Sequence, residues 1–393
     1  MRRIALHAVI YLGYCTAASL AREPQPPKPP GEPAAAEYGE FVDELTKTMN
    51  ARDPAFFQEG LNEEEMVERA LKGLPPEREI SEGLLLGISQ QGNLPDAIVR
   101  ALGDKGSYLP LWVRTVNGKT RVLMRMVTSE GTLNYHEFLL LKNALGRIEA
   151  VDVYVFVTGE LMSQTLRRGA LTLIAEKKKS LVTRLLEGDQ NFLKHVDTIT
   201  AIHQANQGGQ YQRVLDLYAK LPAKMQADKA LMIARIQAAL HVGDEAYLAA
   251  LDDFAKQFPN DPAGDLMLLD ATFLHKDYDK CLATVDSLDK RLGGDPYLNT
   301  FRASVALVQG KTDEAKKFFE AVIAGAPGVV QPYFALVEIS LAQMDFAETA
   351  RLMTVLENEL GMRFPDDLSQ VEIFQPFVES PEYGAWQAKR RQP

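Results

Sequence analysis

The segment 133–160 contains Glu137, Asp152 and His136, and Arg125 precedes it. Its residue types alternate as in two strands around a turn. Pairing these strands through the loop after Lys142 predicts that Glu137 lies directly opposite Asp152. The preceding turn then predicts that Arg125 lies beside His136 on the other face. Two adjacent carboxylates in apolar surroundings repel each other, so one pKa rises and the pair can exchange protons as acid and base. These four residues are the candidate catalytic residues.

The same residues have a simpler interpretation. Like charges can lie opposite each other at the solvated edge of a sheet, at a small energetic cost. A slip of one residue in the register would also separate the pair. The sequence shows no metal-ligand spacing, nucleophile elbow or phosphate-binding loop, so it predicts no metal and no cofactor. It favours a binding protein over an enzyme, with a small-ligand binder or enzyme as the alternative.

The elements that position these residues belong to an α+β region over residues 37–160. Apolar residues first recur at helical spacing, and the period then changes to that of strands in SYLPLWVRTV, KTRVLMRMVTSE, LNYHEFLLLK and RIEAVDVYVFVTG. Consecutive helices followed by consecutive strands indicate an α+β domain with an antiparallel meander.

The order of these elements and the ending NYHEF…VDVYVFVTGE resemble the cone-shaped fold shared by nuclear transport factor two, polyketide cyclases and limonene epoxide hydrolases. The resemblance implies that N-terminal helices cover a strongly curved sheet. It also implies a place for Asp and His side chains on the inner face, because enzymes of this fold use them there.

A long helix is expected to link this domain, over residues 161–194, to a repeat array over residues 195–362. Five similar segments each contain one turn residue, and their separations are 34, 33, 34 and 34 residues: Gly209, Gly243, Lys276, Gly310 and Met344. A fixed period near 34 with two helices in each unit resembles the tetratricopeptide repeat. The fourth copy fits best, with Ala315 and Val322 at small positions and Phe319 at the aromatic position.

The resemblance to tetratricopeptide proteins implies that the first helix of each unit lines a groove for an extended peptide or a partner's helix. One ladder of predicted groove residues is mainly apolar: Ile199, Ile233, Leu266, Thr300 and Phe334. A second ladder, four residues further on, is polar: His203, Gln237, Asp270, Ser304 and Glu338. Neither contains Lys or Arg, which argues against a clamp for a C-terminal carboxylate. The pattern suits a hydrophobic segment with a few hydrogen bonds. Alternatively, the apolar ladder packs within the array or against the linking helix.

The segment 363–393 follows the last repeat and is expected to cover the apolar end of the array. Its aromatic residues are predicted to point inward: Phe374, Phe377, Tyr383 and Trp386.

The N-terminus predicts export. MRRIALHAVIYLGYCTAASLA combines two arginines, an apolar run and small residues, as in a signal peptide over residues 1–21 that is cleaved after Ala21. A proline-rich tether over residues 22–36 follows. We therefore expect a periplasmic or secreted protein of bacterial type, whose membrane attachment would require an uncleaved signal or a lipid on Cys15.

Composition limits the partners. The formal net charge is −10 and the pI is near 5.3, which argues against general nucleic-acid binding because that function requires a basic face. After cleavage Cys281 is the one cysteine left, so no intramolecular disulfide can form. The sequence thus predicts an exported scaffold that binds a peptide or a partner protein.

Overall fold

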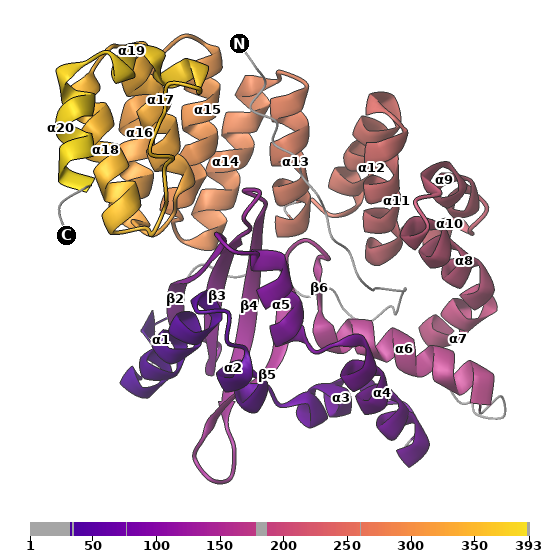
Figure 1. The fold of residues 1–393 in the computed structure, drawn as a ribbon. Coiled ribbons are helices and arrows are strands. Elements are labelled where there is room, and N and C mark those ends of the chain that lie inside the picture. Colours follow the sequence, from indigo (N-terminus) through magenta and orange to yellow (C-terminus); the bar gives the residue numbers. More distant parts are fainter. Residues whose placement is uncertain (1–31, 34, 76, 178–186, 260, 391–393) are drawn as a thin grey trace. The chain divides into compact units, whose positions relative to one another are not determined.

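The structure is a computed structural model that describes residues 32–33, 35–75, 77–177, 187–259 and 261–390 (Figure 1). The predicted signal peptide, Cys15 and most of the tether lie outside the described residues. The chain divides into two compact units. Residues up to His275 together with Lys290–Gly293 form the first unit, and Lys276–Asp289 together with Gly294–Pro393 form the second. In the described ranges, no helix combines the length and apolar character needed to cross a membrane.

An antiparallel sheet forms the centre of the first unit, with its strands in sequence order from β1 to β6. The strands are β1 Glu32–Pro33, β2 Ser107–Val116, β3 Lys119–Val127, β4 Leu133–Lys142, β5 Ile148–Val155 and β6 Glu160–Leu161. Each of the four long strands continues into the next through a turn, as the period-two pattern predicts. The α+β character of this region is confirmed.

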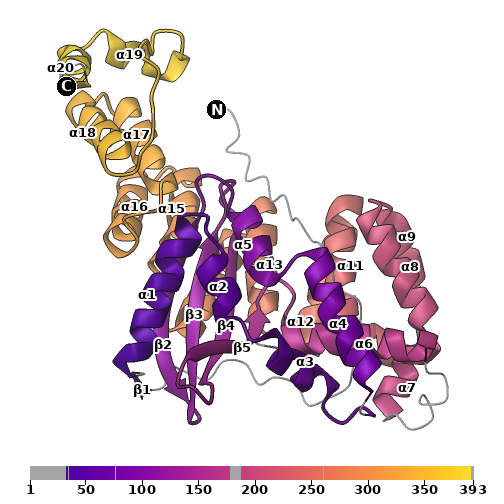
Figure 2. The same cartoon turned by 60° about the horizontal axis from the view of Figure 1, so that its bottom comes forward.

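Helices precede the sheet, and three of them cover one of its faces (Figures 1 and 2). Their bounds are α1 Ala36–Asn50, α2 Ala55–Gly60, α3 Glu63–Leu71, α4 Arg78–Gln91 and α5 Leu94–Leu102. Leu45 of α1, Phe57 of α2 and Leu102 of α5 are buried in one apolar core with Val122 and Phe138 of the sheet. This core fixes which strand residues face the helices.

The register between β4 and β5 differs from the predicted one. Lys142 pairs with Ile148 rather than Arg147, and beyond a bulge after Leu139 the partner of Glu137 is Tyr154. The Asn143 side chain causes the first shift, because its Oδ1 accepts hydrogen bonds from two loop amides and closes a longer loop. The bulge adds a second residue to the shift, so the prediction that Glu137 lies opposite Asp152 was wrong.

The register between β3 and β4 also differs by one residue. The Thr128 amide donates a 3.0 Å hydrogen bond to the Thr132 carbonyl, so the turn closes one residue earlier than predicted. His136 therefore pairs with Met124, and Arg125 pairs with Tyr135. Since a shift of one residue exchanges the faces, Arg125 shares a face with Glu137, while His136 faces the helices. The predicted pairing of Arg125 with His136 was wrong for this reason.

The rest of the chain is mostly helical. In the first unit the helices are α6 Met162–Lys177, α7 Glu187–Lys194, α8 Val196–Gln207, α9 Tyr211–Ala219, α10 Ala223–Gln226, α11 Lys229–Val242, α12 Asp244–Gln257 and α13 Pro262–Leu274. The predicted linking helix corresponds to α6 and α7, and residues 178–186 between them lie outside the described residues.

The second unit contains α14 Tyr278–Leu292, whose last residues group with the first unit. It continues with η2 Pro296–Leu298, α15 Asn299–Val308, α16 Thr312–Gly325, α17 Gln331–Ala342, α18 Phe346–Asn358, η3 Glu372–Phe374, α19 Gln375–Val378 and α20 Pro381–Arg390. Consecutive helices from α15 to α18 pack against each other. Ala315 and Val322 of α16 are fully buried, and Phe319 is 3% exposed.

The turns between paired helices share an unusual backbone conformation. Gly209, Lys276, Gly310 and Met344 have φ values of +67°, +61°, +75° and +56°. A residue with positive φ ends one helix within a single turn and lets the next begin. Glycine adopts this conformation at little cost, whereas Lys276 and Met344 adopt it despite their side chains. The conformation therefore recurs at four of the five turn positions found in the sequence, whereas Gly243 departs from it with φ +154° and ψ 163°.

Candidate functional site

His136 lies on β4 beneath the helices, and both of its ring nitrogens are engaged. The Asn134 amide nitrogen lies 3.1 Å from Nε2, and the Tyr108 hydroxyl lies 2.9 Å from Nδ1. Asn134 Oδ1 accepts the amides of Tyr135 and Val157, so its Nδ2 must be the group that faces His136. Nε2 is then the acceptor, and a neutral ring carries its proton on Nδ1 and donates it to Tyr108.

Burial lowers the pKa of His136 to about 4. The side chain is 3% exposed and contacts the rings of Tyr108 and Phe138. At neutral pH it is uncharged and hydrogen-bonded within the core. This arrangement suits an internal bridge between β2 and β4 better than a proton-transfer group that must reach a substrate.

The two candidate carboxylates have separate partners. Glu137 is 5% exposed and forms an ion pair with Arg121 on β3. Asp152 is 3% exposed and accepts hydrogen bonds from the hydroxyl of Ser163 at 2.6 Å and from its amide at 3.1 Å. Ser163 is the second residue of α6, so Asp152 satisfies a free amide in the first turn of that helix. Arg125 is 2% exposed on the face of Glu137.

Two opposing effects act on the pKa of Asp152. Burial raises its pKa, while the hydrogen bonds from Ser163 and Val153 and the charge of Arg69 oppose this rise. Its carboxylate is fixed by the amide and hydroxyl of Ser163 on α6 and by the amide of Val153 on β5. Glu137 and Asp152 therefore do not form the predicted acid–base pair. Glu137 connects β4 to β3, and Asp152 connects β5 to α6.

A buried polar cluster that the sequence did not indicate lies at the start of α11. Lys229 Nζ lies 2.5 Å from Asp261 Oδ2 and 3.1 Å from the hydroxyl of Tyr154. It also lies over the rings of Tyr154 and Phe258, at 5.5 and 5.8 Å from their centroids. Burial raises the pKa of Tyr154 well above its ordinary value, so the hydroxyl keeps its proton. The cluster joins β5 to α11 and the start of α13.

Asp228 lies next to this cluster and caps α11 by accepting the amide of Leu231. Burial raises its pKa to about 6, against the favourable charge of Arg168, and Glu160 contributes to the rise. Arg168 itself forms a buried ion pair with Glu160. Sequence spacing could not reveal the contact with Asp228, because β6 and α6 are adjacent along the chain but α11 begins far beyond them.

The predicted groove residues of the first unit offer little free surface. Ile199, Ile233 and Leu266 are 1%, 4% and 7% exposed. The turn at Gly159 covers Ile233 so closely that an added Cβ would lie 2.9 Å from its Cδ1. This supports the alternative that the apolar ladder packs against the chain itself.

The polar ladder of the first unit is less enclosed. His203 and Gln237 are half-buried, and burial lowers the pKa of His203. The His203 Nε2 atom lies 3.1 Å from the amide nitrogen of Gln207. The side chain of Asp270 lies outside the described part of the structure.

The predicted groove residues of the second unit are more accessible. Thr300, Ser304 and Phe334 are half-buried, and Glu338 is exposed. Ser304 donates a hydrogen bond to the carbonyl of Thr300 within α15. The mix of one aromatic ring, hydroxyls and a carboxylate can contact both apolar and polar parts of a peptide.

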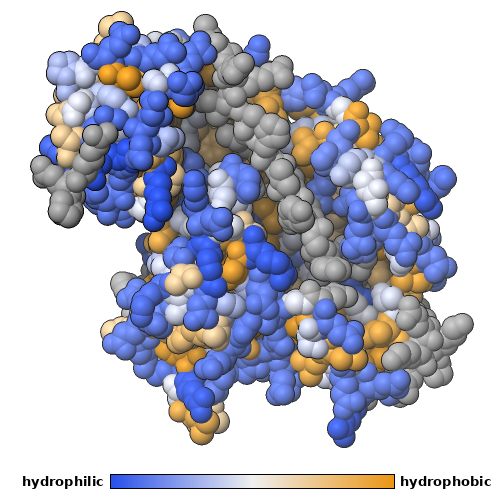
Figure 3. Space-filling model, in the orientation of Figure 1, coloured by the Kyte–Doolittle hydropathy of each residue, from blue (hydrophilic) through white to orange (hydrophobic). Residues whose placement is uncertain are grey.

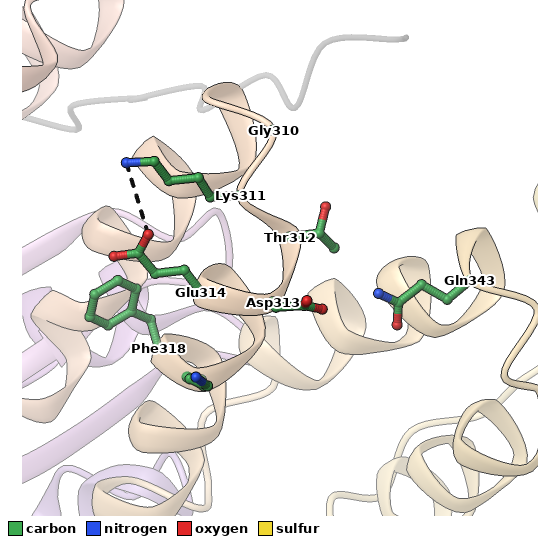
Figure 4. A pocket seen from close by; sticks show the side chains of 8 residues that line it. Gly310, Lys311, Thr312, Asp313, Glu314, Phe318 and Gln343 are labelled. Atoms are coloured by element: carbon green, nitrogen blue, oxygen red, sulfur yellow. Dashed lines mark ion pairs between the residues drawn. The ribbon is translucent and has the colours of Figure 1, made fainter.

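An open depression of about 890 Å³ lies beside the turn at Gly310 (Figure 4). Lys311 and Glu314 form an ion pair of 4.0 Å at its side, and Gln343 approaches from the next turn. Its lining is largely polar and open to solvent, unlike an enclosed catalytic pocket. No cluster of three His, Cys, Asp or Glu side chains suited to a metal occurs in the described ranges.

The face in Figure 3 is mostly polar, with apolar residues in small separate patches among the described side chains. Comparison with known proteins gives no assignment: no family model, no curated protein and no solved structure matches the chain. The geometry itself therefore carries the functional argument.

Proposed function

We propose that the protein is an exported scaffold whose C-terminal helices form a tetratricopeptide-type array that binds a peptide or a partner protein. The N-terminal α+β domain, of the cone-shaped type, serves as a rigid module. In this account the chain acts in the periplasm or outside the cell.

The recurrence of left-handed turns carries the proposal. Gly209, Lys276, Gly310 and Met344 adopt positive φ at separations of 67, 34 and 34 residues, each between two helices. Lysine and methionine rarely adopt this conformation unless the surrounding structure requires it. Burial of Ala315, at the position expected for close helix approach, supports the same register.

The accessible positions favour the second unit as the binding surface. Thr300 on α15 and Phe334 on α17 are half-buried, whereas the corresponding positions of the first unit are buried: Ile199, Ile233 and Leu266. In the polar ladder, Glu338 on α17 is exposed. Partner binding through the second unit would leave the packing of the sheet undisturbed.

The alternative, a small-ligand binder or enzyme with its pocket in the N-terminal domain, has weaker support. His136 is neutral and doubly hydrogen-bonded, and Glu137 and Asp152 are each fixed by the chain's own groups. No observation on these residues favours catalysis over structural stabilisation.

Photo-cross-linking tests the proposal. A photoreactive amino acid placed at Ser304 or Glu338 should capture the same partner from a periplasmic extract, whereas Glu320 on α16 serves as an exposed control. Capture from Ser304 and Glu338 and not from the control supports the scaffold. Equal capture at all three positions, or none, contradicts it.

A further inference from the structure

The segment Gly361–Val371, here called the strap, connects α18 to η3 and is not helical (Figure 1). It runs along the helices of the second unit in an extended course, and η3 then contacts α17. An extended stretch beside the first helix of a repeat has the form that a bound peptide would have.

The strap inserts one aromatic side chain among those of the neighbouring helices. The ring centroid of Phe364 lies 6.1 Å from that of Phe334 on α17 and 6.1 Å from that of Trp386 on α20. Phe374 lies on a third side, at 6.5 Å. Phe334 is one of the predicted groove residues, so the strap occupies part of the surface that a partner was expected to use.

Side chains of α20 hold the strap through its main chain. Arg390 donates a 2.8 Å hydrogen bond to the carbonyl of Phe364, and Gln387 donates one of 2.8 Å to the carbonyl of Asp366. The amide of Leu368 lies 3.4 Å from the hydroxyl of Tyr383. Main-chain contacts of this kind bind an extended peptide with little dependence on its exact sequence.

The strap leaves part of this surface unsatisfied. The Trp386 side chain is 2% exposed, and its Nε1 has no hydrogen-bond partner among the described residues. A buried donor without an acceptor is costly, and the strap supplies no acceptor to it. Arg390 lies over the Trp386 ring at 4.5 Å and pairs with Glu357 at 2.9 Å, and the Asp366 carboxylate of the strap lies at 3.6 Å from the same guanidinium group. An acidic occupant can therefore share this cation with Glu357, as the strap does.

We propose that the aromatic surface formed by Phe334, Trp386 and Arg390 binds extended peptides in which an aromatic residue precedes proline and acidic residues, and that the strap is an internal occupant that such a peptide displaces. The strap itself carries this pattern in Phe364, Pro365 and the two aspartates that follow. The inference rests on the proposed scaffold function and specifies its ligand class.

Binding of a fluorescent peptide with the sequence GMRFPDDLSQ tests the inference. Phe364→Ala should weaken the strap, and the full-length variant should bind the peptide at least tenfold more tightly than the wild-type protein. Val371→Ala, on an exposed strap residue, is the matched control and should bind as the wild type does. A peptide with the same FPDD core and changed flanks should bind, and one with Ala in place of Phe should not.

Hydrogen exchange on the wild-type protein gives a test that needs no variant. Saturating peptide should speed amide exchange in the strap at least tenfold and leave α16 unchanged. Absence of binding to a folded Phe364→Ala variant, or binding without faster strap exchange in the wild type, overturns the inference. If cross-linking at Ser304 and Glu338 still captures one partner in that case, the scaffold function stands and the internal-ligand account alone fails.

Discussion

Lys229 at the start of α11 donates a 3.1 Å hydrogen bond to the hydroxyl of Tyr154 on β5, although 75 positions separate the two residues. The same ammonium group forms a 2.5 Å ion pair with Asp261. Because both side chains are largely buried, these contacts connect the sheet to two helices of the first unit.

Lys229→Met should destabilise the first unit by about 2–4 kcal/mol, because it leaves the Asp261 carboxylate buried without its cation. The amides of β5 and α11 should lose protection from hydrogen exchange together. Lys256→Met is the control, since its ion pair with Asp252 is exposed and should contribute less than about 1 kcal/mol. Equal effects of the two substitutions would show that the cluster at Lys229 is not structural.

Asp228 and His136 should give opposite pH dependences. Burial raises the pKa of Asp228 from 3.8 to about 6, so the folded state binds more protons and stability falls as pH rises through that range. Burial lowers the pKa of His136 from 6.5 to about 4, so the unfolded state binds more protons and stability falls as pH drops through that range. In the wild-type protein the two trends oppose each other.

Single variants separate these trends. Asp228→Asn keeps the cap on α11 and should stabilise the protein at pH 7.5 by about 1–2 kcal/mol. Its stability should then fall more steeply below pH 6.5, whereas that of His136→Gln should rise as pH drops from 6 to 4. Urea unfolding of the first unit across this range measures both slopes. Asp345→Asn, at the exposed cap of α18, should change neither slope.

Sequence patterns predicted the element types well because apolar period and turn residues are local properties. Asn117 and Gly118 form the tight turn between β2 and β3, both with positive φ. The predicted register was wrong where a side chain, rather than the apolar period, sets the length of a loop. At Asn143, Oδ1 accepts hydrogen bonds from two loop amides. The contact of Lys229 with Tyr154 is set by tertiary packing, and no spacing in the sequence encodes it.

The burial of the aromatic residues in segment 363–393 was also predicted in part. Phe377, Tyr383 and Trp386 are buried, as their aromatic character predicted, while Phe374 is half-buried. The strap was not foreseen, because its hydrogen bonds run from α20 side chains to its own carbonyls, and main-chain acceptors carry no sequence signal.

Ala315→Arg should disrupt the second unit, because Ala315 is fully buried in its core and a long charged side chain cannot fit there. The expected loss is about 3 kcal/mol or more, from overpacking and an unpaired charge. Hydrogen exchange should show loss of protection in α15 to α20 and retention in β2 to β5. Glu314→Arg, one residue away and exposed, is the control. Loss of protection across both units would instead indicate one cooperative structure.

Export should produce a mature chain that begins at Arg22, since Ser19 and Ala21 satisfy the requirement of signal peptidase for small residues. N-terminal sequencing of the protein recovered from the periplasm or medium provides the measurement. An intact Met1, or a lipid on Cys15, would refute this part of the account.

The most direct test compares partner affinity after changes in the two regions that could bind. Ser304→Arg with Glu338→Arg alters α15 and α17 of the second unit, and Glu137→Gln with His136→Gln alters the sheet. With the partner captured by cross-linking, titration calorimetry should show at least a tenfold loss of affinity for the first double variant and no change for the second. Unchanged affinity in the first, together with a comparable loss in a folded second variant, would place binding in the α+β domain and contradict the scaffold account.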